Sequence, residues 1–139
     1  MKHLEITIRI DWSDLDVYEH VNNVSIIRYL QSARVNFWEL SGLYESYKKT
    51  NRGPMLISTS CDFKKSLFYP GIIQIKSKIA YIKNSSFSLE HRILDQNGEV
   101  CVQAKDVAVC FDFNIEKTFP VPDKIRAFME NYSSNFKDI

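Results

Sequence analysis

The chain has 139 residues and a mass of 16.3 kDa, which is the size of one domain. Apolar residues make up 45% of it, enough for a core that needs no disulfide or metal. Its 18 basic and 17 acidic residues leave a net charge of +1, which argues against a nucleic-acid partner because neutralising phosphates requires a basic face.

The first predicted element is a strand over residues 3–12, because apolar and polar side chains alternate there with a period of two. The apolar series is Leu4, Ile6, Ile8, Ile10 and Trp12. The alternation stops at Ser13. A polar segment rich in Asp, His and Asn then runs to Asn23 and shows neither the strand nor the helix period.

A long amphipathic helix follows, with Asn22 or Asn23 as its cap and Gly42 near its end. Its apolar residues recur at spacings of three and four, as in Ile26, Ile27, Leu30, Ala33, Phe37, Leu40 and Tyr44. Residues 45–54 are mostly polar and predict a connecting segment without regular structure.

Four further strands are predicted over residues 55–68, 72–82, 86–94 and 99–112. Pro70-Gly71 and Asn97-Gly98 mark turns between them. In the last strand the apolar parity slips, so we expect a bulge near Lys105-Asp106. Consecutive strands with short turns predict an antiparallel sheet that covers the helix, in one α+β domain over residues 1–139 with a short helix or tail from about 123.

The cysteines and the apolar runs predict a cytoplasmic protein. Cys61, Cys101 and Cys110 form an odd set without C-x-x-C spacing, so we expect reduced, mostly buried thiols and no metal site. The longest apolar run has five residues, too few for a membrane span. The polar residues near the N-terminus do not fit a signal peptide.

One segment gathers groups that could carry chemistry: Asp14-Leu-Asp16-Val-Tyr-Glu-His20-Val-Asn22-Asn23. It precedes a helix N-terminus, whose free N–H groups and positive dipole end can hold an oxyanion. A carboxylate beside that point could act as a general base or a nucleophile toward an acyl carbon. From these residues alone, a loop that merely caps the helix explains the pattern equally well.

This segment, with Tyr29-Leu30 and Ala33-Arg34 after it, resembles the opening motif of hotdog-fold acyl-CoA thioesterases, and more narrowly their 4-hydroxybenzoyl-CoA thioesterase-like branch. Further similar features follow in the family's order: Pro54, Asp62-Phe63, Tyr69-Pro70-Gly71, Asn84-Ser85-Ser86 and Asn97-Gly98-Glu99. The resemblance implies a five-stranded antiparallel sheet wrapped around one long central helix. It also implies hydrolysis of acyl-CoA to a free acid and CoA, without a cofactor.

The resemblance also implies roles for residues of the motif. Asp16 matches the catalytic aspartate, and Asn23 lies where a backbone N–H polarises the thioester carbonyl. His20 and Asn22 match positions that shape the loop and the pocket. Glu19 departs from the family, where many members have glycine; if this position needs a positive φ, Glu is costly there.

Binding of the CoA part is implied at a later turn, where Ser85 and Ser86 match positions that help receive pantetheine or phosphate. Basic side chains that could meet the phosphates are scattered over Lys64, Lys65, Lys76, Lys78, Lys83 and Arg92. Of these we favour Lys83, because it adjoins that turn. His91 lies among apolar residues of its strand, so we expect a buried, hydrogen-bonded histidine rather than a catalytic one.

A sheet that covers one helix leaves its edge strands open, and open edges invite pairing. In relatives two domains pair edge to edge, with the active site at the interface. The resemblance therefore implies a homodimer, or a tetramer made of two such dimers.

Two other functions stay open. A non-catalytic module that binds acyl-CoA or acyl-carrier protein is the first alternative. Hydration or dehydration of acyl thioesters ranks last, because the His/Asp arrangement of dehydratases is not evident. The sequence does not distinguish aliphatic from aromatic acyl groups, or CoA from carrier-protein thioesters.

Overall fold

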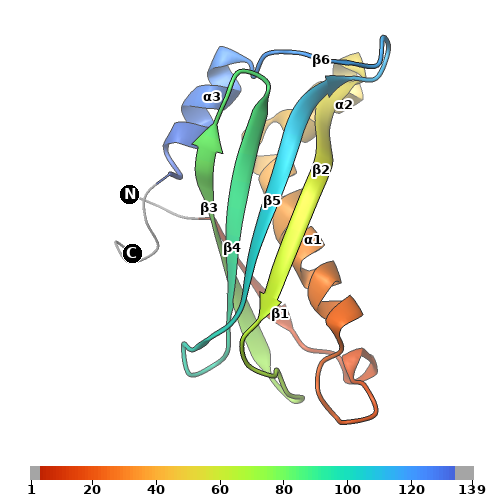
Figure 1. Cartoon of the computed structure of the whole chain (residues 1–139), viewed down its shortest axis with the longest axis vertical. Helices are drawn as coiled ribbons and strands as arrows, with labels where there is room; N and C mark the ends of the chain where they lie inside the picture. The colour runs from red at the N-terminus through yellow and green to blue at the C-terminus, as the bar shows by residue number, and fades with distance from the viewer. Residues whose placement is uncertain (1–3, 134–139) are drawn as a thin grey trace.

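A computed structural model describes residues 4–133 (Figure 1). All its strands lie in one sheet with the order β1-β3-β4-β5-β2, in which every pair is antiparallel and β6 adds to β5. The elements in chain order are β1 (Leu4–Arg9), a 3₁₀ turn (Trp12–Asp14), α1 (Asn23–Ser41), α2 (Leu43–Thr50), β2 (Arg52–Phe63), β3 (Ile72–Ile82), β4 (Ser86–Leu94), β5 (Val100–Asp112), β6 (Lys117–Thr118) and α3 (Asp123–Glu130).

The long strands run side by side and α1 lies along one face of the sheet (Figure 1). The loop before α1 is at one end of the molecule, and the β3–β4 turn, β6 and α3 are at the other (Figure 1). This arrangement confirms the predicted α+β fold, an antiparallel sheet wrapped around one central helix.

The connection predicted over residues 45–54 is wrong, because α2 occupies Leu43–Thr50 and β2 begins at Arg52. Gly42 adopts a left-handed φ of 89° that ends α1 and lets a second helix start at once. Leu43 is completely buried and anchors this second helix. Leu43 is the one buried residue of α2, and a single buried position sets no helical period, so the sequence pattern could not reveal this helix.

The bulge expected near Lys105-Asp106 is also wrong. β5 pairs with β4 without a break from Val102 to Val109. Asp106 faces the helix and is only 1% exposed. The alternation of apolar residues along β5 is therefore interrupted because a polar residue occupies a core position, and not because the strand bulges. A register shift lies on β2 instead, between Leu56 and Ser58.

The core consists of two apolar clusters packed between α1 and the sheet. One surrounds Leu30 and Ile75 near the start of α1, and the other surrounds Phe37 and Phe87 near its end. On each central strand a polar side chain separates the clusters: Ser77 on β3, His91 on β4 and Asp106 on β5. These, with Arg34 and Thr59, are called the polar row below.

The polar row is fully hydrogen-bonded. Asp106 Oδ2 accepts from Arg34 Nε at 3.0 Å and lies 2.7 Å from His91 Nε2, while its Oδ1 accepts from Thr59 Oγ1 at 2.8 Å. Ser77 Oγ lies 2.7 Å from the other ring nitrogen of His91. The prediction of a buried, hydrogen-bonded His91 is confirmed. Burial opposes ionisation of Asp106, but the bonds from His91 and Arg34 prevail and lower its pKa to about 2.

The three cysteines are free thiols; Cys101 and Cys110 are buried and Cys61 is partly exposed. Burial raises the pKa of Cys110 to about 11. Within residues 4–133, no helix has the length and apolar character that crossing a membrane would require.

Candidate active site

Asp14 fixes the loop to the central helix. Its buried carboxylate accepts from the Tyr29 hydroxyl at 2.6 Å and from Ser25 Oγ at 3.2 Å, and it forms an ion pair with Arg28. Its backbone carbonyl accepts from the N–H of Asn22 at 2.9 Å. Burial raises the pKa of Asp14, but the bonds from Tyr29 and Arg28 outweigh it and leave that pKa below its usual range.

Asp16 closes a tight turn with one of its carboxylate oxygens. Oδ1 accepts from the backbone N–H of Tyr18 at 2.8 Å and of His20 at 3.1 Å. Glu19, inside this turn, has a φ of 65°, so the position does require the left-handed conformation that suits glycine. Oδ2 of Asp16 accepts no hydrogen bond from residues 4–133 and is left for another partner.

The start of α1 supplies unpaired donors beside this carboxylate. Asn22 is the N-cap, as predicted, and its side chain accepts from the N–H of Ser25 at 2.8 Å. Asn23 is the first residue of the helix, where N–H groups have no partner within the helix. The N–H groups of Asn23 and Val24 have no acceptor within the described part of the chain.

A pocket of about 190 Å³ brings the loop and the helix start together. Three predicted site residues line it: Asp16, His20 and Asn23. The other lining residues are Val21, Ile26 and the run from Phe63 to Leu67. His20 is held beside Phe68 by a β-bridge and by an edge-on ring contact with centroids 5.0 Å apart.

The sequence predicted segment 63–67 as the end of the strand over residues 55–68, which was expected to help set the length of the acyl pocket. It follows β2 and is separated by about forty residues from the aspartate motif. It reaches the pocket because Val21 donates its N–H to Leu67 at 2.9 Å and the N–H of Lys64 donates to the carbonyl of Cys101 at 2.7 Å. Of this segment the sequence named Lys64 and Lys65 as candidates for binding phosphate, and the structure adds Ser66 and Leu67 to the pocket lining.

The residues predicted to receive CoA lie elsewhere in the single chain. Lys83 and Ser85 lie in the β3–β4 turn and Ser86 begins β4, at the opposite end of the sheet from the loop before α1 (Figure 1). Arg126 of α3 donates to the carbonyl of Lys83 at 2.7 Å, and the carbonyl of Ser85 accepts from the N–H of Cys110 at 2.8 Å. Within one chain, these contacts hold the turn against α3 and β5.

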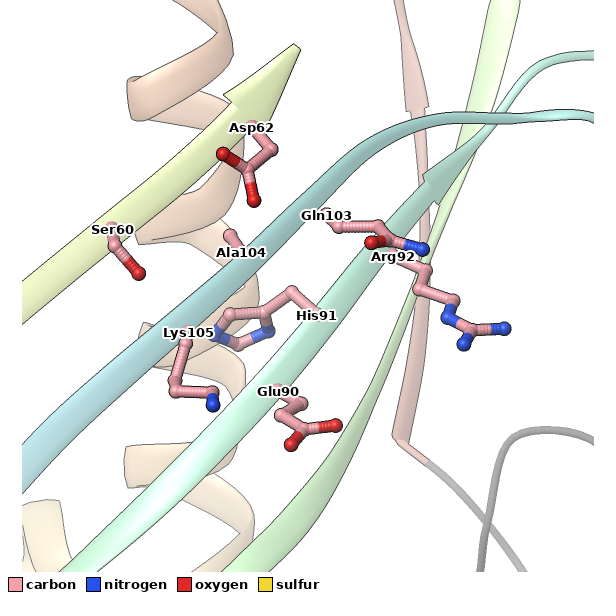
Figure 2. A pocket seen from close by; sticks show the side chains of 8 residues that line it. All are labelled: Ser60, Asp62, Glu90, His91, Arg92, Gln103, Ala104 and Lys105. Carbon is pink, nitrogen blue, oxygen red and sulfur yellow. The ribbon is translucent and has the colours of Figure 1, made fainter. Parts of the chain in front are cut away.

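A second hollow, of about 320 Å³, lies over β2, β4 and β5 (Figure 2). Glu90 is directly opposite Lys105, and Arg92 is directly opposite Gln103, so these side chains share one face. In Figure 2 the helix passes behind the strands, which places this face away from α1. The remaining lining residues are Ser60, Asp62, His91 and Ala104. Its charges are of both signs, and none of the aspartate-motif residues lines it.

The pocket at the helix start can therefore do acyl chemistry. Unpaired N–H groups at a helix N-terminus stabilise negative charge that develops on a carbonyl oxygen. A carboxylate oxygen without a hydrogen bond can attack a carbon or accept a proton from water.

The chain is similar in sequence to known thioesterases. The family model described as thioesterase-like superfamily matches residues 10–129. The long-chain acyl-CoA thioesterase FadM of Escherichia coli is 23% identical over 128 residues, which cover 91% of this chain and 97% of that protein.

Solved structures share the fold. A Staphylococcus aureus protein in complex with CoA superposes with a TM-score of 0.89 at 9% identity, covering 95% of this chain and 84% of that one. A 1,4-dihydroxy-2-naphthoyl-CoA thioesterase from Synechocystis gives a TM-score of 0.83 at 13% identity, covering 96% of this chain and 100% of that one.

Proposed function

Because the chain belongs to the thioesterase-like superfamily and has its hotdog fold, we propose that it hydrolyses acyl-CoA thioesters to a free acid and CoA. The observation that carries this proposal is the pocket lined both by Asp16, whose Oδ2 accepts no hydrogen bond within residues 4–133, and by Asn23, whose N–H is unpaired there. The similar proteins named above include a long-chain and an aromatic acyl-CoA thioesterase, so we propose the acyl-CoA class without choosing an acyl group.

In the proposed reaction the thioester carbonyl rests on the N–H of Asn23, which stabilises the oxyanion. Asp16 is fixed through Oδ1, so Oδ2 is the atom that reacts. As a base, it takes a proton from water; the water oxygen bonds to the carbonyl carbon, the C–S bond breaks, and the thiolate receives the proton. As a nucleophile, it forms an acyl-Asp16 anhydride that water then hydrolyses. His20 forms the wall of the pocket beside the acyl carbon.

The decisive experiment is Asp16→Asn. The amide oxygen of Asn can still accept the two backbone hydrogen bonds, so the loop keeps its shape. We expect kcat for thiol release from acyl-CoA to fall by at least ~10²-fold, since a positioned base or nucleophile contributes that much. The thermal melt should be unchanged. Asp123→Asn, at an exposed position at the start of α3, is the matched control and should keep wild-type turnover.

Three possible results distinguish the alternatives. Turnover of Asp16→Asn within about threefold of wild type would remove Asp16 from the reaction. Wild-type protein that binds short, long and aromatic acyl-CoAs but releases no thiol would be a binding module instead. Transfer of heavy oxygen from solvent water into the Asp16 carboxylate during turnover would identify the anhydride route.

We also infer that two chains pair through β2. This strand has 12 residues and forms one edge of the sheet, which makes it an open template for pairing. Large apolar side chains are exposed along it and at the start of α1, with Ile57 54%, Phe63 47% and Val24 79% exposed. Light scattering at micromolar concentration should give the mass of a dimer or tetramer, and a monomer mass would contradict this pairing.

A further inference from the structure

The basic side chains that the sequence offered as phosphate ligands lie at different places in the structure. Lys76 and Lys78 flank the buried Ser77 on β3, so they point to the outer face of the sheet. Lys83 lies in the β3–β4 turn at the far end. Lys64 and Lys65, by contrast, line the pocket that contains Asp16.

Of these two lysines, Lys64 is the one without a counter-ion. Lys65 forms an ion pair with Glu99. The ammonium of Lys64 has no acidic partner within residues 4–133, although its backbone N–H is held by the carbonyl of Cys101. A fixed backbone with an unpaired, exposed cation at a pocket is suited to an anionic group of a ligand.

The same segment borders a second pocket. This pocket, of about 320 Å³, shares Lys65, Ser66 and Leu67 with the Asp16 pocket, so the two adjoin along the chain after β2. It is also lined by the polar β4–β5 turn, Asp95 to Asn97, and by apolar residues that include Ile10 and Phe68. A substrate extending from Asp16 across residues 64–67 would therefore meet a further hollow.

We propose that Lys64 binds a phosphate of the substrate's phosphopantetheine carrier, and that this carrier leaves the Asp16 pocket across residues 64–67 toward the second pocket. This assignment rests on the proposed thioester hydrolysis and adds to it where the thiol half of the substrate lies. CoA and acyl-carrier proteins share the phosphopantetheine arm, so both present the phosphate that a lysine binds as a point charge.

The test compares one acyl group on four carriers: CoA, 4′-phosphopantetheine, acyl-carrier protein, and pantetheine, which lacks phosphate. Lys64→Gln should raise KM for CoA and phosphopantetheine thioesters about three- to tenfold at low ionic strength and leave kcat unchanged. It should not change KM for the pantetheine thioester. The difference should shrink at about 0.15 M salt, because an exposed charge is screened. Lys64→Arg should restore the wild-type KM.

Two further variants locate the effect. Lys124→Gln removes an exposed lysine from α3 and should change no KM. A larger rise with Lys83→Gln than with Lys64→Gln would overturn the assignment and move the phosphate to the β3–β4 turn. An equal rise with the pantetheine thioester would also overturn it, because Lys64 would then act on the reacting atoms. A rise with acyl-carrier protein as well as CoA supports it for both carriers.

A direct measurement of CoA binding tests the role of Lys64 independently of thioester hydrolysis. Titration calorimetry with CoA should show a Kd raised by a similar factor in Lys64→Gln, whether or not thioesters are hydrolysed. If the pantetheine thioester is hydrolysed in an Asp16-dependent way but Lys64→Gln binds CoA as wild type does, the proposed function stands and the Lys64 assignment fails. If no thioester is hydrolysed, the proposed function fails and the CoA titration alone decides on Lys64.

Discussion

Asp16 and Asp106 are both carboxylates, yet their surroundings differ in a way that separates reactivity from stability. Asp106 is 1% exposed, and both of its oxygens are bonded, to Arg34, His91 and Thr59. Asp16 is partly exposed, and only Oδ1 is bonded, to backbone N–H groups. A carboxylate with every oxygen satisfied stabilises the fold, whereas one with an oxygen left over can react.

Asp14 shows that position in the motif does not decide this. It is two residues from Asp16, but its carboxylate is buried and bonded by Tyr29, Ser25 and Arg28, as fully as that of Asp106. The geometry therefore favours Asp16 as the reactive member of the pair, and Asp14 as the residue that holds the loop on α1.

The largest effect on stability is expected at the polar row. Asp106→Ala leaves the Arg34 guanidinium buried without its counter-ion, so we expect the free energy of unfolding to fall by about 3–5 kcal/mol. Urea denaturation measures this. The double variant Asp106→Leu with Arg34→Met should recover part of the loss, because it removes both charges. A loss below about 1 kcal/mol in the single variant would show that the polar row does not stabilise the fold.

A smaller loss is expected where the loop meets α1. Asp14→Asn weakens hydrogen bonds to a charged acceptor, and we expect a loss of about 1.5–3 kcal/mol in the same denaturation experiment. Asp16→Asn should lose far less stability while losing turnover. Arg28→Gln is the matched control, with a smaller loss, because the Arg28 side chain is 60% exposed. Equal losses in Asp14→Asn and Asp16→Asn would remove the distinction between the two acids.

Acid should act on the polar row in a defined pH range. The pKa of Asp106 is lowered from 3.8 to about 2 in the folded protein, by the bonds from His91 and Arg34 against the effect of burial. A lowered folded pKa means that this stabilisation, about 2 kcal/mol, is complete above pH ~4 and is lost as the pH falls toward 2. Urea denaturation between pH 6 and 2 should show a steeper loss in wild type than in Asp106→Asn. Parallel curves would contradict it.

The smallest effect is expected at Glu19. Its φ of 65° is strained for a residue with a side chain, so Glu19→Gly should stabilise the protein by about 0.5–1 kcal/mol. Glu19→Ala keeps the strain and should give no gain. Thermal denaturation of both variants measures the difference. Destabilisation by Gly would show that the Glu19 side chain contributes more than the backbone strain costs.

Much of the site was predictable because its parts are close in sequence. The cap at Asn22 and the turn closed by Asp16 depend on hydrogen bonds between residues at most four positions apart. Such local bonds can be predicted from residue types and their spacing. The resemblance of this stretch to a thioesterase motif then indicated the fold and the reaction class. The alternating strands and the helix of period 3.6 were likewise readable from local pattern.

Contacts between distant residues decided the rest. Arg34 and Asp106 are separated by 72 positions, so their ion pair could not be predicted from local pattern. The core-facing Asp106 was mistaken for a bulge because the alternation rule places polar side chains of a strand on its outer face. The sequence favoured Lys83 over Lys64 among the scattered basic residues, and the pairing of β2 with β5 places Lys64 at the Asp16 pocket instead. Sequence thus determined which short segments could form, since their bonds are local. Only the assembled sheet determined which carboxylate was left unsatisfied and which cation lies beside it, because those facts depend on strands that meet across the whole chain.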